Sequence, residues 1–469
     1  MSELIQPPAG TMPERRAGRP PGPRSLSPLS SAVALQRDPI RFALEIWHRY
    51  GDVVHFRFLF WPAYVLYHPE HVKRVLQENN RNYTKNFPNM KVARELFGNG
   101  LFTNDGESWL RQRRLMQPSF HHKRLTGFGR LMSEAAVAML ERWQATTSGD
   151  APLDIPLEMM RLSLRIAGLT LFSLDLSDEV DFVGRTFTTL GPLIYRYASL
   201  PFPPLWVPTP RNRRLLAGLN TLDTVVYAII NERRKQPVDA NVPDLLWMLL
   251  SARDEETGEG MSDQQLRDEV LTLLLAGHET TATALTWTWY LLSQHPEVER
   301  RLHAELDTVL AGQLPTVEDL DVLPYTRMVI QEALRLYPPA FGFTRFATAS
   351  DEIGGYAIPA NSVMFVSAYC THRHPAFWEE PEAFDPERFT PERSAGRPRF
   401  AYIPFGGGPR QCIGNAFAMM EAQLVLATVA QRYSLRLVPG HPVEPQVLLT
   451  MRPRDGLPMT LHPRLQGNG

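Results

Sequence analysis

The sequence predicts a mainly α protein with a small β region. Residues 69–235 are mostly helical in pattern, and a further helix that begins at Ser262 is unusually long. Residues 52–67, in contrast, cluster β-branched and aromatic side chains around Trp61 and Pro62, which indicates a hairpin with its turn at that pair. Because no internal repeat or long linker interrupts the chain, we expect residues 31–469 to form a single domain.

The chain of 469 residues has the composition of an ordinary globular protein, with 43% hydrophobic and 21% charged residues. Its 49 Lys and Arg residues nearly balance its 50 Asp and Glu residues, so the protein has no net positive charge that would favour binding to nucleic acid or to an anionic membrane. The two cysteines, Cys370 and Cys412, do not make a disulfide framework, and such low usage is typical of a reducing cytosol. We therefore expect a cytoplasmic protein that does not bind nucleic acid.

Residues 1–30 are rich in proline, arginine and glycine, which predicts a disordered or extended leader. The N-terminal region has neither the apolar stretch of a signal peptide nor an apolar run long enough to span a bilayer. We therefore expect no membrane anchor.

The long helix is expected to cover residues 262–294. Ser262 followed by Gln265 forms a capping-box pattern at its start, and Pro296 follows its end. The usual helix has about 11–12 residues, so this one is more than twice the ordinary length. A helix this long that is apolar on most faces must cross the interior of the protein.

The middle of this helix is nevertheless polar, reading Ala-Gly-His-Glu-Thr-Thr over residues 276–281. Its His278 and Glu279 argue against a transmembrane helix. Burying the Glu279 carboxylate would cost free energy unless it is hydrogen-bonded or serves a function. Thr280 is expected to bond back to the carbonyl of Ala276 and so distort the helix. A distorted helix beside a cavity would also suit proton transfer.

Shorter elements are expected on both sides of the long helix. Pro338 and Pro339 stop an amphipathic helix that ends at residues 329–337. The other expectations are irregular chain near residues 82–104 and 201–210, a strand within 363–369, and a helix over 416–431 directly after a glycine-rich loop.

That glycine-rich loop reads FGGGPRQCIG over residues 405–414 and contains Cys412 just before the helix. Arg410, the backbone N–H groups of the glycine turn and the helix dipole would all favour a thiolate. Glycines also allow a flat, bulky ligand to approach the backbone closely. From chemistry alone, a buried and inert cysteine stays an equal alternative. For Cys370, in the expected strand, we predict that inert role.

Two other interpretations of these motifs fail. The glycines are not followed by Gly-Lys-Ser/Thr and match no G-x-G-x-x-G spacing, which excludes a phosphate-binding loop. A zinc-protease motif at His278-Glu279 would need a second histidine at position 282, where the chain has Ala282.

Two residue pairs have ordinary explanations when each is taken alone. Glu332 and Arg335, three residues apart, would form an ion pair on a helix surface, which contributes little to stability. Trp109 and Arg113, four residues apart, would be an aromatic–cation pair on a helix. Neither pair by itself decides a function.

Together, these stretches resemble the cytochrome P450 family of haem-thiolate monooxygenases over most of the chain. The haem loop of that family reads F-x-x-G-x-R-x-C-x-G, and every fixed place is filled here, by Phe405, Gly408, Arg410, Cys412 and Gly414. Four further stretches match in order: W-x-x-x-R at Trp109 and Arg113, the oxygen-activating segment at 276–281, E-x-x-R at Glu332 and Arg335, and Pro386-Glu387-Arg388-Phe389, which matches better than the second Pro-Glu-Arg at 391–393.

The resemblance implies a cytochrome P450 fold with haem b between the long central helix and the cysteine loop. Cys412 would be the axial thiolate ligand of the iron, with Phe405 in the same loop also contacting the haem. Thr280 and Glu279 would be the catalytic residues that deliver protons. The other implied roles are propionate binding by Arg410, Trp109, Arg113 and Arg345, structural support near the haem by Glu332, Arg335 and Arg388, and a substrate pocket that includes Ala276, Phe341, Phe343, Phe87 and Met451.

The implied activity is insertion of one oxygen atom of dioxygen into a lipophilic substrate, by hydroxylation or epoxidation. Fatty acids, terpenoids and other natural products all stay open as substrates. The intact Glu279-Thr280 pair favours a monooxygenase over two alternatives, a haem-thiolate peroxygenase or isomerase and a non-catalytic haem-binding sensor.

Electrons from NAD(P)H are expected to arrive indirectly, because nothing after the haem region resembles a flavin or iron–sulfur domain. A separate ferredoxin or flavodoxin with its reductase would supply them to a monomeric protein. One candidate docking surface is a basic cluster, for which a solvated charged face is the ordinary alternative; its members are Arg111, Arg113, Arg114, His121, His122, Lys123 and Arg124.

Overall fold

The computed structural model describes residues 18–23, 30–146, 151–175, 190–197, 203–235, 244–253 and 258–464. Most of the expected leader, residues 1–30, therefore lies outside the described residues. The chain forms two compact units that alternate along the sequence. Unit 1 comprises Met1–Phe87, Phe341–Pro381 and Arg397–Gln411, and unit 2 comprises Pro88–Ala340, Glu382–Gly396 and Cys412–Gly469.

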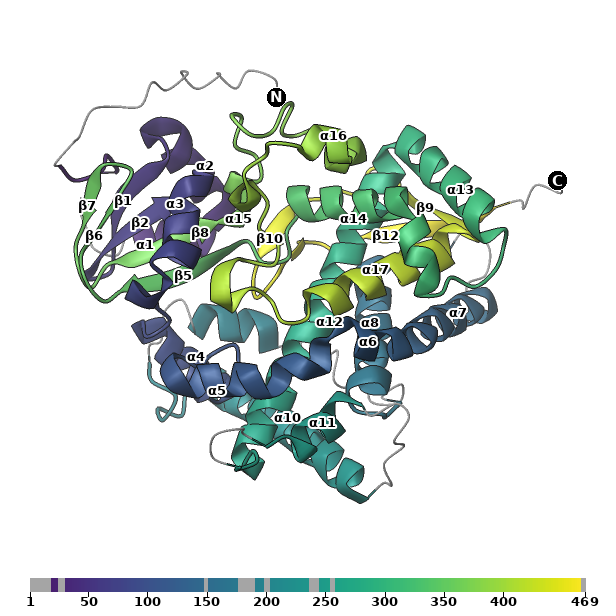
Figure 1. Cartoon of the computed structure of the whole chain (residues 1–469), viewed down its shortest axis with the longest axis horizontal. Helices are drawn as coiled ribbons and strands as arrows, with labels where there is room; N and C mark the ends of the chain where they lie inside the picture. Colours follow the sequence, from purple (N-terminus) through teal and green to yellow (C-terminus); the bar gives the residue numbers. More distant parts are fainter. Residues whose placement is uncertain are drawn as a thin grey trace. The chain divides into compact units, whose positions relative to one another are not determined.

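Unit 1 is built on a five-stranded sheet with the strand order β1, β2, β8, β5, β3 (Figure 1). Strands β2 and β8 are parallel, and the other neighbours are antiparallel. Buried apolar side chains such as Tyr64, Met364 and Phe400 form its core. The elements of unit 1 are α1 Ser30–Arg37, α2 Pro39–Tyr50, β1 Val53–Phe58, β2 Trp61–Leu66, α3 Pro69–Lys73, η1 Arg74–Glu78, η2 Asn80–Asn82, β3 Tyr83–Thr84, β5 Gly342–Ala347, β6 Asp351–Ile353, β7 Tyr356–Ile358, β8 Val363–Ser367, α15 Ala368–Thr371, η7 Arg399–Ala401 and η8 Gly408–Arg410.

The predicted hairpin is present as β1 and β2, but its turn is not at Trp61-Pro62. Phe58 pairs with Trp61, so Leu59 and Phe60 alone form the turn, and Pro62 lies in β2 opposite Arg57. Leu59 adopts the left-handed conformation that a tight turn demands, with φ at 54°. The prediction placed the turn at the proline because proline favours turns, whereas strand pairing decided the register.

Unit 2 is mainly helical and is organised around α12, which covers Asp263–Gln294. Helices α8, α10, α14 and α17 pack against it. As predicted, the Ser262 side chain caps α12 by accepting a hydrogen bond from the Gln265 N–H at 3.2 Å, and the helix ends before Pro296. The elements of unit 2 are α4 Pro88–Phe97, α5 Gly106–Met116, η3 Gln117–Phe120, α6 His122–Leu125, η4 Thr126–Phe128, α7 Gly129–Thr146, β4 Leu153–Asp154, α8 Ile155–Leu171, α10 Pro210–Lys235, α11 Leu245–Ser251, α12, α13 Pro296–Leu310, η5 Glu318–Val322, α14 Pro324–Leu336, η6 Pro386–Phe389, α16 Pro391–Ser394, α17 Asn415–Ala430, β9 Tyr433–Leu437, β10 Pro445–Val447, β11 Met451–Pro453 and β12 Pro458–Pro463.

Two boundaries differ from the sequence-based expectations. The stretch expected to be irregular at residues 82–104 contains the helix α4, which begins with Pro88 at a position where proline is favoured and buries Val92 and Leu96 one turn apart. The strand expected within 363–369 ends at Ser367, whose side chain then caps the short helix α15. The helix predicted after the cysteine loop is confirmed as α17.

The mainly α architecture with small β sheets is confirmed. Besides the main sheet, unit 1 has the pair β6–β7, and unit 2 has the three-stranded sheet β4–β12–β9 and the pair β10–β11. Among the described residues, no helix combines the length and the apolar character that a membrane crossing requires.

Candidate active site

Cys412 lies in unit 2, three residues before the first residue of α17, and is accessible to solvent. Cys370, by contrast, is fully buried, as expected for an inert thiol, although it belongs to α15 and not to a strand. Surrounding protein raises the pKa of Cys412 by desolvation, while the backbone N–H of Gly414 and the charge of Arg113 lower it. Cys412 is therefore an accessible residue with two groups that stabilise its thiolate form.

Arg113 and Trp109 lie on α5 in unit 2, and both are half-buried. Burial lowers the pKa of Arg113, and the Cys412 thiolate opposes that effect. Within the described part of the chain, no carboxylate forms an ion pair with Arg113. A half-buried guanidinium without a carboxylate partner suits an additional anionic group, as a haem propionate would be.

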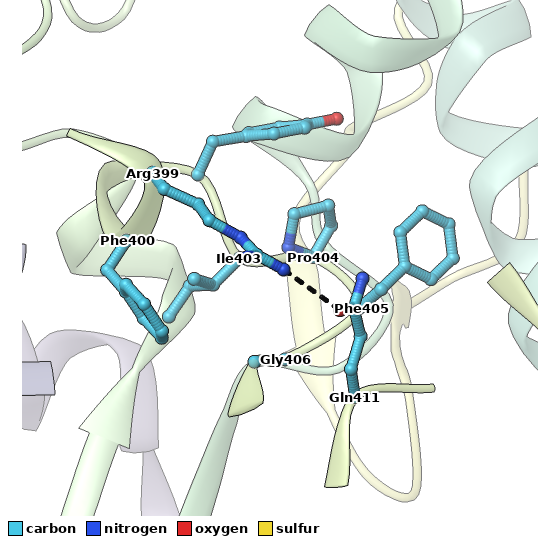
Figure 2. A pocket seen from close by; sticks show the side chains of 9 residues that line it. Arg399, Phe400, Ile403, Pro404, Phe405, Gly406 and Gln411 are labelled. Atoms are coloured by element: carbon cyan, nitrogen blue, oxygen red, sulfur yellow. Dashed lines mark hydrogen bonds between the residues drawn. The ribbon is translucent and has the colours of Figure 1, made fainter. Parts of the chain in front are cut away.

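The residues that precede Cys412 in the loop line a pocket within unit 1 (Figure 2). Arg399 Nη2 donates a hydrogen bond to Gln411 Oε1 at 3.2 Å across it, and Phe400 and Phe405 lie on opposite sides. Gly408 adopts a left-handed φ of 67°, and a Cβ on it would lie 1.8 Å from the carbonyl oxygen of Leu76. The backbone of the loop therefore requires glycine at this position for both conformation and space.

Two further arginines that the family resemblance assigns to the haem propionates belong to unit 1. Arg345 is buried on β5 and donates from Nη1 to the carbonyl of Thr344 at 2.9 Å. Arg410 is half-buried at the end of η8. Their haem contacts stay predictions.

The polar middle of α12 differs in accessibility from the rest of that helix. Ala276 is exposed and Thr280 is half-buried, whereas Leu274 and Leu285 on either side are fully buried. As expected, the Thr280 hydroxyl bonds back to the carbonyl of Ala276, at 2.6 Å. His278 is buried, and its burial lowers its pKa to about 4, so it is neutral near pH 7. The helix thus presents Ala276 and Thr280 to accessible space.

Glu279 has a partner that sequence reasoning missed. Thr450, in the turn between β10 and β11, donates a hydrogen bond from Oγ1 to Glu279 Oε1 at 2.8 Å. Burial raises the pKa of Glu279, while the Thr450 hydrogen bond and the charge of Arg452 lower it. The two partners are 171 positions apart. No local pattern in the sequence connects residues at that separation.

Glu332, Arg335 and Arg388 meet in the interior of unit 2. Arg335 contacts both carboxylate oxygens of Glu332 at 2.7 Å, through Nε and Nη2, and Arg388 Nε donates to Oε1 at 3.2 Å. Glu332 and Arg335 are completely buried. The surface ion pair that spacing alone suggested is therefore wrong, and the three residues form the cluster that the family resemblance implied. Arg393, in the second Pro-Glu-Arg, instead pairs with Asp385.

The residues expected to line the substrate pocket are divided between the two units. In unit 1, Phe87 is buried against Trp61 and Phe346, with ring centroids 5.3 and 5.8 Å away. Phe341 lies beside Tyr369 with ring centroids 5.9 Å apart. The other three are half-buried Phe343 in unit 1, and exposed Ala276 and fully buried Met451 in unit 2. Their contact with a substrate stays a prediction.

The basic cluster is carried by α5, α6 and the turn between them in unit 2. Arg114, His121 and Arg124 are exposed, and Arg111 lies 3.8 Å from the carboxylate of Glu259. The side chains of His122 and Lys123 lie outside the described part of the structure. A role in docking an electron donor stays a prediction.

Within the described residues, no group of three or more His, Cys, Asp and Glu side chains could hold a metal ion. Cys412 is accessible, lies beside a helix N-terminus and has the cation Arg113 nearby. It could therefore supply a single thiolate ligand to a metal whose other ligands belong to a cofactor. Haem iron with one thiolate ligand meets that description. The fold and the site thus define a haem-thiolate protein.

The chain belongs to the cytochrome P450 family, which it matches over residues 20–457. Among curated proteins it is 40% identical to cyclooctatin synthase of Streptomyces melanosporofaciens, over 93% of this chain and 94% of that protein. It is 39% identical to cyclooctat-9-en-7-ol 5-monooxygenase of the same organism, over 91% and 92% of the two chains. Pentalenene oxygenase of Streptomyces avermitilis is 36% identical over 96% of this chain and 98% of its own.

This membership confirms the cytochrome P450 fold and the activity class expected from the sequence. The protein is a monooxygenase that uses haem and dioxygen, receives electrons from a redox partner and acts on a lipophilic substrate.

Proposed function

We propose that this monooxygenase hydroxylates or epoxidises a terpenoid. The support comes from the relatives, two of whose names specify terpenoid skeletons, cyclooctat-9-en-7-ol and pentalenene. Both relatives are similar to this chain over more than nine-tenths of its length. A terpenoid also agrees with the apolar and aromatic residues predicted to line the substrate pocket. Among the substrate classes left open by the sequence, terpenoids are therefore favoured over fatty acids and other natural products.

The observation that carries the haem assignment is the accessible Cys412 sulfur together with Arg113, which has no carboxylate partner among the described residues. Cys412 would ligate the iron, and Arg113 with Trp109 would bind a propionate. The loop motif extends the same assignment to Phe405 and Arg410, and the family pattern extends it to Arg345. When bound, haem supplies the reductive activation of dioxygen and the oxidising power for insertion into a C–H or C=C bond.

The protein itself would contribute proton delivery. Thr280 holds a proton on Oγ1, which it donates to the Ala276 carbonyl, and a rotation of its side chain would present that proton to the accessible side of α12. Glu279, one residue earlier, would return a proton to Thr280 from solvent. The buried cluster would have an indirect, structural role, in which Glu332, Arg335 and Arg388 fix the backbone of η6 and α14.

Electrons would come from NAD(P)H through a separate ferredoxin or flavodoxin and its reductase, with the basic cluster on α5 and α6 as the docking surface. We further expect a monomeric, cytoplasmic protein in which residues 31–469 form one domain. The docking role would be lost if reversing the charge of Arg114 left the rate of haem reduction unchanged at low salt.

The test is a spectral titration of the purified ferric protein with cyclooctat-9-en-7-ol, pentalenene and a long-chain fatty acid. A terpenoid that displaces the iron-bound water shifts the Soret band towards the high-spin position. Product analysis with a surrogate ferredoxin system then identifies the oxidised compound. A shift with the fatty acid and with neither terpenoid would overturn the substrate proposal while leaving the monooxygenase class intact.

A further inference from the structure

The turn between β10 and β11 is fixed to the interior of unit 2 by its backbone. The Trp287 indole on α12 donates from Nε1 to the carbonyl of Met451 at 2.7 Å, and the Met451 N–H donates to the carbonyl of Pro339 at 2.9 Å. The Trp287 ring stacks on Tyr337 with centroids 4.0 Å apart and an angle of 7°. Thr450, the residue before Met451, therefore has a well-defined position against α12.

The Thr450 side chain lies between two residues that are one helical turn apart on α12. Its Oγ1 donates to Glu279 Oε1 at 2.8 Å and lies 3.3 Å from Thr283 Oγ1. Because Thr450 has one hydroxyl proton and directs it at Glu279, the hydrogen between the two threonines must come from Thr283. The donors thus run from Thr283 to Thr450 to the carboxylate, and both threonines are buried.

We propose that Thr450 is a positioning residue for proton delivery, which orients the Glu279 carboxylate and keeps it ionised as an acceptor for the next proton. This inference rests on the proposed relay role of Glu279. A hydroxyl that donates to a carboxylate favours the charged form. The charged side chain that acts on Glu279 in the same direction is Arg452, which belongs to β11.

The hydrogen bond from Thr450 connects Glu279 to a segment that is predicted to contact substrate. Thr450 precedes Met451, one of the residues predicted for the substrate pocket, and the two share one tight turn in which the Leu448 N–H donates to the Thr450 carbonyl at 3.0 Å. A substrate that displaces this turn would also move the hydroxyl that orients Glu279. The bond between Thr450 and Glu279 therefore makes proton delivery sensitive to the position of this turn.

The experiment is an infrared titration of the carboxylic-acid C=O band of Glu279 in the substrate-free holoenzyme. Burial raises the pKa values of two other carboxyl groups, Glu269 and Glu421, to about 8, so the Glu279 band is assigned by subtracting the spectra of Glu279→Gln. Thr450→Val keeps the shape and removes the donor, and it should raise the titration midpoint by about one pH unit, the effect of one charge-assisted hydrogen bond. Thr450→Ser should restore the wild-type midpoint.

Thr288→Val is the matched control, because Thr288 is also buried in unit 2 but donates only to the carbonyl of Ala284 in its own helix. It should leave the midpoint unchanged. If Thr450→Val does not fold, Thr283→Val keeps Thr450 and removes only its donor, and a smaller rise in the same direction is expected. A midpoint equal to the wild type in whichever of these two variants folds overturns the proposal.

A second measurement links the midpoint to turnover. With a plant-type ferredoxin and its reductase as surrogate donors, Thr450→Val should release at least twofold more hydrogen peroxide per NADPH oxidised than Thr288→Val. A shifted midpoint with unchanged peroxide release would overturn the link to proton delivery. The infrared titration needs no substrate, so it can succeed or fail independently of the terpenoid assignment.

Discussion

The backbone N–H of Leu101 donates a hydrogen bond to Glu269 Oε2 on α12 at 2.9 Å. Two residues earlier, the Asn99 N–H donates to Asp268 Oδ2 at 2.7 Å. Between them, a Cβ on Gly100 would lie 2.2 Å from Thr272 Oγ1, so only glycine allows the segment to approach the helix so closely. Two acidic side chains of α12 thus hold residues 99–101.

Glu269 should make stability depend on pH. Burial raises its pKa from 4.5 to about 8, so between these values the native protein holds a proton that the unfolded chain has released. The contribution of Glu269 to the unfolding free energy should therefore fall as pH rises through this window, by about 1.4 kcal/mol per pH unit, and level off above it. Glu421, whose pKa burial also raises to about 8, contributes a similar fall. Glu269→Gln should therefore remove only the part due to Glu269, as measured by urea denaturation from pH 5 to 9. Glu107→Gln, which alters an exposed side chain of α5, is the control and should retain it.

Gly408→Ala should destabilise the protein more than the same substitution at a glycine that also has a positive φ but has free space around it. At Gly440, where φ is 80° and a Cβ would have no other atom within 4 Å, alanine adds only the conformational cost of about 1–2 kcal/mol. At Gly408, the clash with the Leu76 carbonyl should add about 1–3 kcal/mol or more. Equal denaturation midpoints for the two variants would contradict the close packing of the loop.

Glu332→Ala should cost about 3–5 kcal/mol of unfolding free energy, because it leaves the buried guanidinium groups of Arg335 and Arg388 without their carboxylate. Arg393→Ala breaks the more exposed ion pair with Asp385 and should cost about 0–1 kcal/mol. Guanidinium denaturation of both variants measures the difference. A Glu332 variant as stable as the Arg393 variant would show that the buried cluster is not structural.

Cys412→His should abolish the thiolate-type absorption spectrum of the ferrous carbon monoxide complex and the monooxygenase activity, because imidazole does not supply the electron density of a thiolate. Cys370→Ala should retain both, since that thiol is fully buried in α15. Retention of the thiolate spectrum by Cys412→His would refute the ligand assignment.

Thr280→Ala should uncouple electron consumption from product formation. The variant loses the hydroxyl proposed to deliver protons, so NADPH oxidation should continue while hydrogen peroxide or excess water replaces most of the product. Thr286→Ala, whose hydroxyl bonds to the Ala282 carbonyl inside the helix, is the control and should stay coupled. Unchanged coupling in Thr280→Ala would assign proton delivery to another group.

Patterns confined to a few neighbouring residues predicted their structures well. The cap at Ser262, the return bond from Thr280 to Ala276 and the helix after Cys412 are all as expected, because each depends on residues no more than four positions apart or on helix periodicity. The hairpin turn was misplaced at Trp61-Pro62, since the register of β1 and β2 depends on pairing along both strands. The helix α4 was missed because its short amphipathic pattern lies between polar, turn-like stretches.

The sequence by itself determined the mainly α class, the long central helix, and, through the ten-residue motif around Cys412, the haem-thiolate family and its chemistry. Only the tertiary structure decided which partners the polar residues have. Glu332 is buried between two arginines and not on a surface, Glu279 is held by Thr450, and Asp268 and Glu269 together hold residues 99–101 on α12. The reason is physical: capping and helix periodicity act between near neighbours, whereas burial and ion pairing depend on segments that only folding brings together.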